Sequence, residues 1–366
     1  MDRRWTLLGI ALSSFAVLFL ASSAVGGAPG PLRKNTSSQI EALAMNGSRV
    51  AYDVSARFTS PRRRCNTVYV WNTATQATTA MSGKGTCNAD VTSTGAGVRE
   101  LKVAGLRVAW IVNQGGNSES DDYLYTSSLP RPNERKLGSA VRTGEVMGGL
   151  VCGGRHSAGL AGPWIGCLVG AGKFLAVNRW TTDESGHVMA GRLQSIGTNL
   201  RTIVSGSDSM DAVATDGKQV AVLRAGGGVA LYTAGGQLLR TVTPTSPKEV
   251  ALRGDYLVVL TTANRLEVYN SHSGKLLHAW RAAKGARYLD VSSKLAAYAA
   301  PLPGGWYLRA VHLLSLPTGK DRVLAKTSPQ IVGVQLEPAG LVYAVNRTGS
   351  SGVGYLAFTP MNRLSG

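Results

Sequence analysis

Acidic, aromatic, histidine and cysteine residues are all scarce in this chain of 366 residues. It has 21 Asp and Glu against 39 Lys and Arg, five His, four Cys and an aromatic fraction of 7%. No long helical pattern follows residue 25, which argues against a helical fold. Glycine, by contrast, is abundant at 45 residues, as many short strands joined by tight turns require. Because the apolar fraction of 44% suffices for a core, we predict an all-β protein.

The N-terminus has the pattern of an export signal. Arg3 and Arg4 form a charged beginning, Trp5 to Leu20 is a weakly polar to apolar run, and small residues then offer a cleavage site after Ala24. We therefore predict a signal peptide over 1–24 and a secreted or extracytoplasmic mature chain. The run is near the lower length limit for spanning a bilayer, so an uncleaved membrane anchor is the alternative.

Export would place the four cysteines in an oxidising compartment, where an even number favours disulfides over metal binding. Short separation favours the pairs Cys65–Cys87 and Cys152–Cys167, although four cysteines allow three pairings and the sequence alone cannot choose among them. No two cysteines have the CxxC spacing typical of zinc sites, so we predict no metal site.

One phrase recurs along the chain: a glycine, two further residues, and a short apolar run that often ends in an aromatic residue. A glycine at the start suits a tight turn, and the run suits a strand packed between neighbours. Repeats of about 40 residues built in this way are typical of four-stranded propeller blades. Clear copies are GSRVAY at Gly47, GLRVAW at Gly105, GKFLAV at Gly172, GKQVAV at Gly217 and GDYLVV at Gly254, and looser copies begin at Ser292 and Pro338.

Counting the copies predicts a β-propeller of seven blades. Six blades are the alternative, because the third copy has a poorly defined start. The last copy lacks an outer strand, which we expect the stretch around Asn35 to Ile40 to supply, closing the ring. The prediction is thus one propeller domain over 37–366, preceded by a linker or closing strand over 25–36. The expected blade limits are 37–83, 84–144, 145–206, 207–244, 245–285, 286–328 and 329–366.

The repeating unit resembles those of the WD40-like, quinoprotein-like and TolB-like β-propellers over roughly residues 37 to 366. The segment VYNSHSGKLLHAW, Val268 to Trp280, is similar to the quinoprotein form, in which a turn glycine precedes a tryptophan that docks between blades. The corresponding segments that end in LLRTV and TGKDRVLA lack this tryptophan, which a quinone enzyme would be expected to repeat around the ring. The resemblance therefore implies a fold and no particular chemistry or cofactor.

Three insertions interrupt the repeats, and all lie in the N-terminal half. They are SARFTSPRRRC in the first copy, NQGGNSESDD in the second and CGGRHSAGLAGPWIGC in the third. Stapled loops on one side of a ring are where a binding surface is expected, whereas the plainer interpretation is that the insertions are only tolerated. The candidate binding residues are Arg62, Arg63, Arg64, Arg155, His156 and Trp164.

No group of residues in the sequence has the pattern of a catalytic site. The five histidines fall in different copies without a shared register, and no GxSxG motif has a histidine partner. The charge is the unusual property: the formal net charge is +18, or +17 without the two arginines and one aspartate of residues 1–24. Such a field attracts anionic polymers and lipid headgroups. Aromatic residues are not interleaved with the basic ones as in a single-strand nucleic-acid binder.

We therefore expect a monomeric, secreted propeller that binds an unknown protein or cell-envelope ligand, or acts as a scaffold, without a cofactor and without specific nucleic-acid binding. Two alternatives stay open. One is a lyase or hydrolase with its site at the channel mouth, which acidic or histidine side chains converging on the axis would favour. The other is a basic binder of anionic cell-envelope polymers, whose binding would fall steeply with salt.

Overall fold

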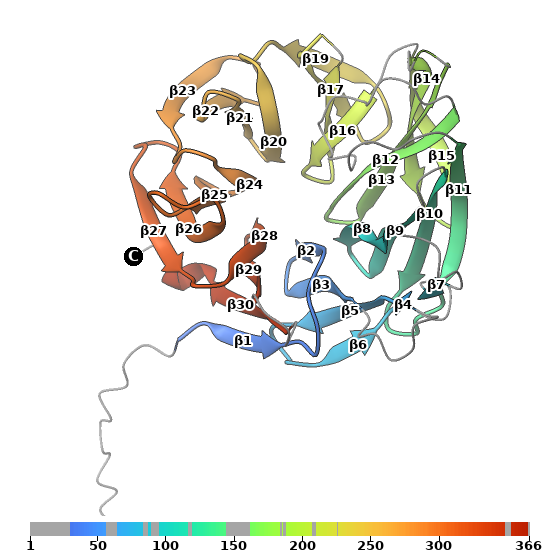
Figure 1. Ribbon diagram of the computed structural model, residues 1–366. Coiled ribbons are helices and arrows are strands. Elements are labelled where there is room, and N and C mark those ends of the chain that lie inside the picture. Colours follow the sequence, from blue (N-terminus) through green and yellow to red (C-terminus); the bar gives the residue numbers. More distant parts are fainter. Residues whose placement is uncertain are drawn as a thin grey trace, which may run out of the picture. The chain divides into compact units, whose positions relative to one another are not determined.

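The described residues form seven four-stranded antiparallel sheets arranged as the blades of a ring (Figure 1). The computed structural model describes residues 30–55, 64–82, 87–88, 95–115, 119–143, 162–183, 185, 188–206, 210–224, 226–347 and 353–364. All seven sheets belong to one compact unit, 31–366. The prediction of an all-β propeller with seven blades is confirmed, and the six-blade alternative is wrong.

In blades 1 to 6 the four strands follow one another along the chain, and the first strand is innermost. Blade 1 contains β2 (Leu43–Asn46), β3 (Arg49–Val54), β5 (Thr67–Asn72) and β6 (Thr78–Ala80). Blade 2 contains β8 (Gly95–Ala104), β9 (Arg107–Gly115), β10 (Glu119–Ser128) and β11 (Arg135–Thr143). Blade 3 contains β12 (Gly162–Ala171), β13 (Phe174–Thr182), β14 (Val188–Ile196) and β15 (Leu200–Gly206).

The next three blades repeat this order and carry shorter strands. Blade 4 contains β16 (Met210–Thr215), β17 (Gln219–Arg224), β18 (Val229–Thr233) and β19 (Leu238–Val242). Blade 5 contains β20 (Pro247–Arg253), β21 (Tyr256–Thr261), β22 (Arg265–Asn270) and β23 (Leu276–Arg281). Blade 6 contains β24 (Arg287–Ser292), β25 (Leu295–Pro301), β26 (Leu308–Ser315) and β27 (Asp321–Lys326).

Blade 7 is built from both ends of the described chain. Its strands β28 (Gln330–Glu337), β29 (Gly340–Asn346) and β30 (Gly354–Pro360) are completed on the outside by β1 (Leu32–Asn35), which runs antiparallel to β30. The closing strand lies within the segment 25–36 that the sequence analysis proposed as a linker or closing strand, and only its last residue, Asn35, belongs to the stretch 35–40. A short 3-10 helix, η2 (Met361–Arg363), follows β30.

In blades 1, 2, 3 and 5 the recurring glycine is the first residue of a two-residue turn between the first and second strands, whereas Gly217 of blade 4 is the middle residue of a three-residue turn. Gly47 occupies this position in blade 1 with φ 58°, and Gly254 occupies it in blade 5 with φ 55°. Glycine adopts positive φ without a steric cost, which explains why the repeat phrase begins with it. In blade 6 the same position is Ser293, with φ 52°, so that copy resembles the others less closely.

The hydrophobic core is divided among the blades, because each of the seven larger clusters of buried residues in the described chain joins two consecutive blades. Between blades 1 and 2, for example, Trp110 is fully buried beside Val70 and Leu101. Between blades 7 and 1, Leu356 packs with Val50. A blade therefore buries its two faces only against its neighbours, as in other repeat architectures.

A second contact between blades repeats near the circumference. The glycine in the turn before the outermost strand lies against the outermost strand of the preceding blade. A Cβ atom on Gly236 would lie 1.9 Å from the carbonyl oxygen of Ile203, and one on Gly319 would lie 2.5 Å from the Trp280 ring. The Trp280 Nε1–H also donates a hydrogen bond to the Leu316 carbonyl oxygen at 2.8 Å. Trp280 thus docks on the next blade, as the resemblance implied.

Gly319→Ala is expected to lower the free energy of unfolding by about 2 to 4 kcal/mol, because it adds a Cβ at φ 69° and drives it into the Trp280 ring. Gly304 provides a matched control, since its φ is 75° and no atom lies within 4 Å of a Cβ built there. Gly304→Ala should cost only about 1 kcal/mol, the conformational part of the penalty. Denaturant unfolding measures the free energy of unfolding of both variants. Equal losses of stability would show that the Trp280 ring moves aside for the added Cβ without a measurable cost.

Candidate functional site

The antiparallel order of the strands gives the ring two different rims. The turns between first and second strands and between third and fourth strands lie on one rim, here called the turn rim. The connections between second and third strands and between blades lie on the other, here called the loop rim. Turn-rim connections have two to six residues, whereas the connections longer than six residues all belong to the loop rim: 36–42, 55–66, 81–94, 144–161 and 347–353.

Most of the predicted binding residues belong to these long connections. Arg62, Arg63, Arg155 and His156 lie outside the described residues, and Arg64 begins β4 (Arg64–Cys65). The strands on either side of 55–66 and 144–161 end at the loop rim, so the first and third insertions are attached to one side of the ring. The second, 113–122, lies mostly within β9 and β10, which are joined on the same rim by only three residues, 116–118.

The first predicted disulfide has suitable backbone geometry. β4 pairs with β7 (Cys87–Asn88) so that Cys65 lies directly opposite Cys87. Opposed residues of antiparallel strands have Cα atoms about 4.5 to 5.5 Å apart, which is within the range that a disulfide spans. Cys167 is buried in β12, while Cys152 lies outside the described residues, so the second pair stays a prediction.

Trp164 is not part of an exposed surface, contrary to its place among the candidate binding residues. It lies in β12, is 1% exposed and stacks on Trp180 with ring centroids 6.3 Å apart. Its Nε1–H donates a hydrogen bond to the Thr182 hydroxyl at 2.8 Å. The close approach of Trp180 depends on Gly166, where a Cβ would lie 1.9 Å from the Trp180 ring. Trp164 therefore supports blade 3 rather than a ligand.

The loop rim carries an exposed aromatic pair that the sequence analysis missed. Trp306 is 93% exposed and Tyr307 is 54% exposed, both in the connection between β25 and β26 of blade 6. The Arg309 guanidinium lies 5.7 Å from the centre of the Tyr307 ring. The signal was available as an aromatic pair directly after the turn sequence Pro303-Gly304-Gly305. Exposed aromatic side chains next to arginine are frequent anchors in protein interfaces.

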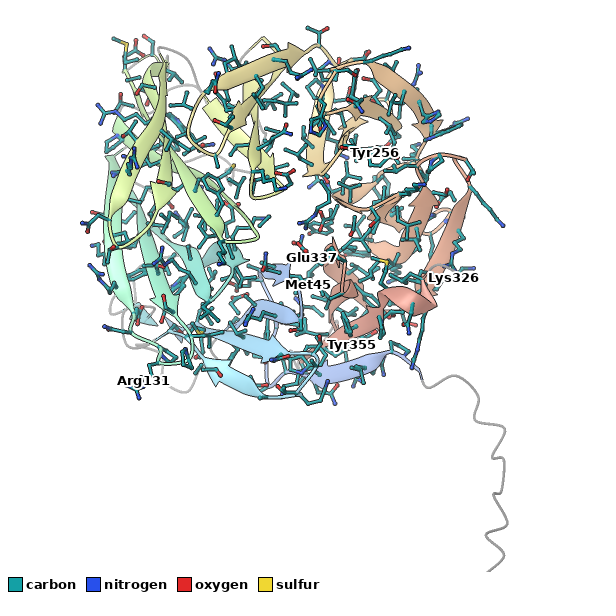
Figure 2. All side chains as sticks on the ribbon, turned by 180° about the vertical axis from the view of Figure 1, so that it is seen from behind. Met45, Arg131, Tyr256, Lys326, Glu337 and Tyr355 are labelled. Carbon is teal, nitrogen blue, oxygen red and sulfur yellow. The ribbon has the colours of Figure 1, made fainter. Side chains whose placement is uncertain are left out.

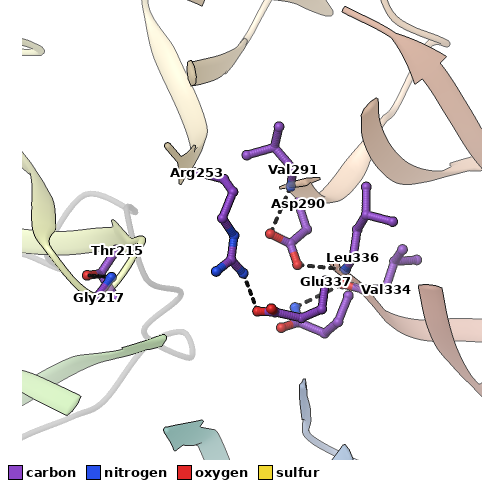
Figure 3. Close-up of polar contacts among 9 residues, drawn as sticks. Thr215, Gly217, Arg253, Asp290, Val291, Val334, Leu336 and Glu337 are labelled. Atoms are coloured by element: carbon purple, nitrogen blue, oxygen red, sulfur yellow. Dashed lines mark hydrogen bonds and ion pairs between the residues drawn. The ribbon is translucent and has the colours of Figure 1, made fainter. Parts of the chain in front are cut away.

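The axis of the ring holds a polar cluster near the turn rim (Figure 3). Arg253, Asp290 and Glu337 come from the innermost strands β20, β24 and β28 of three consecutive blades. Arg253 forms an ion pair with Glu337, and the Asp290 carboxylate accepts hydrogen bonds from the backbone N–H groups of Val291 and Leu336, each at 2.8 Å. Figure 2 labels Glu337 and Met45 at the inner edge of the ring.

Burial governs the protonation of both carboxyl groups. It raises the pKa of Asp290, although the hydrogen bonds from the Leu336 and Val291 N–H groups and the nearby Arg253 charge lower that pKa. It also raises the pKa of Glu337 to about 7, although the Arg253 guanidinium lowers it and Asp290 raises it further. Arg253, Asp290 and Glu337 line a cavity, and Lys102 of β8 lines it too. Acidic side chains thus converge on the axis, which is the observation that the sequence analysis named as favouring the enzyme alternative; here both carboxyl groups also have protein partners. The cluster connects blades 5 and 6 to blade 7 through these contacts.

A second polar network lies within blade 6. The Tyr298 hydroxyl donates a hydrogen bond to Asp321 Oδ2 at 2.5 Å, and His312 Nδ1 lies 3.0 Å from the same oxygen. The His312 ring stacks on Tyr298 with centroids 4.8 Å apart. These contacts join β25, β26 and β27, so this histidine holds strands together.

In the residues that the structure describes, no group of three or more His, Cys, Asp or Glu side chains is placed to hold a metal ion. No helix within the described ranges is long and apolar enough to cross a membrane.

Comparisons with known proteins show the fold alone. No family model matches the sequence, and no curated protein matches it. A chain in the crystal structure of the Mitotic Checkpoint Complex is 14% identical, with a TM-score of 0.53 over 95% of this chain and 99% of that chain. This protein is a seven-bladed β-propeller. Saccharomyces cerevisiae Sqt1 is 9% identical (TM-score 0.48; 90% of this chain, 99% of that chain), and the designed Ika8 protein is 13% identical (TM-score 0.48; 89% and 98%).

The raised pKa of Glu337 predicts a loss of stability with rising pH. An acid whose pKa is higher in the folded than in the unfolded state binds more protons when folded, so stability falls between the ordinary value of 4.5 and about 7. The fall should be on the order of 3 kcal/mol at most. Glu337→Gln cannot titrate and should lack it. Melting temperatures of both proteins from pH 4.5 to 8 provide the measurement, and parallel curves would contradict the assignment.

Proposed function

We propose that this protein is a secreted β-propeller that binds a protein or cell-envelope ligand through its loop rim. The observation that carries the proposal is the uneven length of the connections. Those of the turn rim never exceed six residues, while the loop rim carries connections of up to 18 residues, 144–161. Binding residues of rigid scaffolds are concentrated on such loops, because their length and sequence can vary without disturbing the core.

Trp306 and Tyr307 are described residues of this rim that we expect to anchor the ligand. A tryptophan that is 93% exposed presents nearly its whole ring to solvent, and its burial in an interface would contribute more than that of most residue types. The neighbouring Arg309 would supply a charged contact beside the apolar one. Together they match the composition of interface centres, in which tryptophan, tyrosine and arginine are enriched.

Photo-crosslinking tests the proposed rim. A photoreactive phenylalanine analogue at Trp306 is expected to form covalent adducts with a component of the cell envelope from the same organism. The same analogue at Leu106, which is 50% exposed in a two-residue turn of the turn rim, should form none and serves as the control. Equal adducts from both positions, or none from Trp306, would contradict binding through this rim.

Salt distinguishes a specific partner from an anionic polymer. Adducts that persist at about 0.5 M salt, where the Debye length is roughly 4 Å, would favour a specific ligand. Retention of polymer alone, lost at this salt concentration, would favour the alternative that the net charge of +18 drives binding and that Arg62, Arg63 and Arg64 contribute to it.

Export and disulfide formation belong to the same proposal. Protein purified from outside the cytoplasm and then denatured without reductant should have no reactive thiols, and four after reduction, because the sequence has four cysteines. Mass spectrometry of the unreduced digest should recover Cys65 joined to Cys87, whose strands are opposed, and Cys152 joined to Cys167. Two or more free thiols in the native secreted protein would contradict this part of the proposal.

A further inference from the structure

The turn rim of blade 6 carries a groove with an apolar lining. It has a volume of about 500 Å³ and lies between the two turns of blade 6 and the segment that follows β30. Its apolar side chains are Leu295 and Leu313 from blade 6, with Met361 and Leu364 from the end of the described chain. Pockets of this size hold small organic ligands.

The polar side chains around the groove have one sign of charge. Lys294, Lys320 and Arg322 line it, and none of its lining residues is acidic. Both lysines are exposed, and within the described part of the chain neither forms an ion pair. An apolar lining with cations at its margin is complementary to an apolar molecule that carries a negative charge at one end.

The backbone around the groove is already hydrogen-bonded. The Lys294 carbonyl oxygen accepts from the Leu316 N–H at 2.8 Å, and the Lys320 carbonyl oxygen accepts from the Ser315 N–H at 2.9 Å. The Leu364 carbonyl oxygen accepts from the Arg322 guanidinium. A peptide bound in extended form relies on free backbone groups, and these three carbonyl oxygens already have partners, whereas an alkyl chain needs none.

We propose that this groove binds a single-chain amphiphile with an anionic head, such as a fatty acid or a monoalkyl phosphate. The alkyl chain lies along Leu295, Leu313, Met361 and Leu364, and the head lies between Lys294 and Lys320. The groove is on the rim opposite to the long connections, so the proposal does not depend on the function assigned to the loop rim.

Decanoate is the probe for the first test, at concentrations below those at which it forms micelles. With methyl-labelled methionine, the Met361 resonance should shift saturably because its side chain lines the groove. Met189, which is 63% exposed on blade 3, reports non-specific adsorption and should not shift. Decyl phosphate should bind in the same way if the anionic head is the shared requirement, and neutral 1-decanol should bind more weakly.

Charge-matched variants locate the head group. Lys294→Ala combined with Lys320→Ala should weaken decanoate binding about tenfold, as expected for the loss of two exposed ion pairs. The control combines Lys173→Ala with Lys275→Ala, which occupy the corresponding turn positions of blades 3 and 5 and change the net charge equally. The control should bind within about twofold of the unaltered protein. Lys294→Arg with Lys320→Arg should restore binding.

Three results would overturn the proposal. The first is a Met189 shift that follows the Met361 shift, which would indicate adsorption over the whole surface. The second is equal weakening by the groove variant and its control, which would indicate an effect of net charge alone. The third is binding that appears only after residues 365 and 366 are removed, which would assign the groove to the chain's own C-terminus. Circular dichroism of each variant establishes that the fold is retained.

Discussion

Closure of the ring by β1 and β30 is the contact on which the other contacts between blades depend. β1 supplies the outermost strand of blade 7, and the Asn346 side chain bonds both the N–H and the carbonyl of Ile40, at 2.9 and 2.8 Å. Loss of these contacts would weaken the junction of blades 7 and 1, which otherwise rests on the apolar cluster that they share. Because every blade is stabilised by two neighbours, an open ring would leave two blades half supported.

The sequence predicted the blades well because each blade is a local object. Its strands, turns and apolar runs recur within about 40 residues, and the repeated turn glycine marks the start of each copy. All seven expected blade limits contain the observed sheets, apart from the closing strand. That strand, Leu32–Asn35, is four mostly polar residues without an apolar alternation of its own. Its structure is determined by β30, more than 300 residues away, so no local pattern gave its bounds. Only the missing outer strand of the last copy pointed to a closing strand, which the sequence analysis placed in 25–36 or around 35–40.

The axial site could not be predicted because it is not local. Arg253, Asp290 and Glu337 occupy no shared motif, and they meet only because successive blades turn about one axis. The prediction that Trp164 belongs to a binding surface was wrong for a related reason. Its position beside glycines and a proline is typical of a loop, but the partner that buries it, Trp180, lies on the next strand, and Gly166 makes room for it. The contacts of these residues depend on how strands pack in space, which the local sequence pattern does not specify.

The two rims differ in how closely their turns pack against the neighbouring blade. On the turn rim, Gly236 and Gly319 touch the preceding blade so closely that an added Cβ would collide with it. Longer turns there would displace these contacts, so their length is constrained. Connections on the loop rim begin and end on buried strands and can lengthen without altering either blade. Recognition by large partners is therefore compatible with the loop rim, whereas a ligand of the turn rim must fit the fixed spaces between turns.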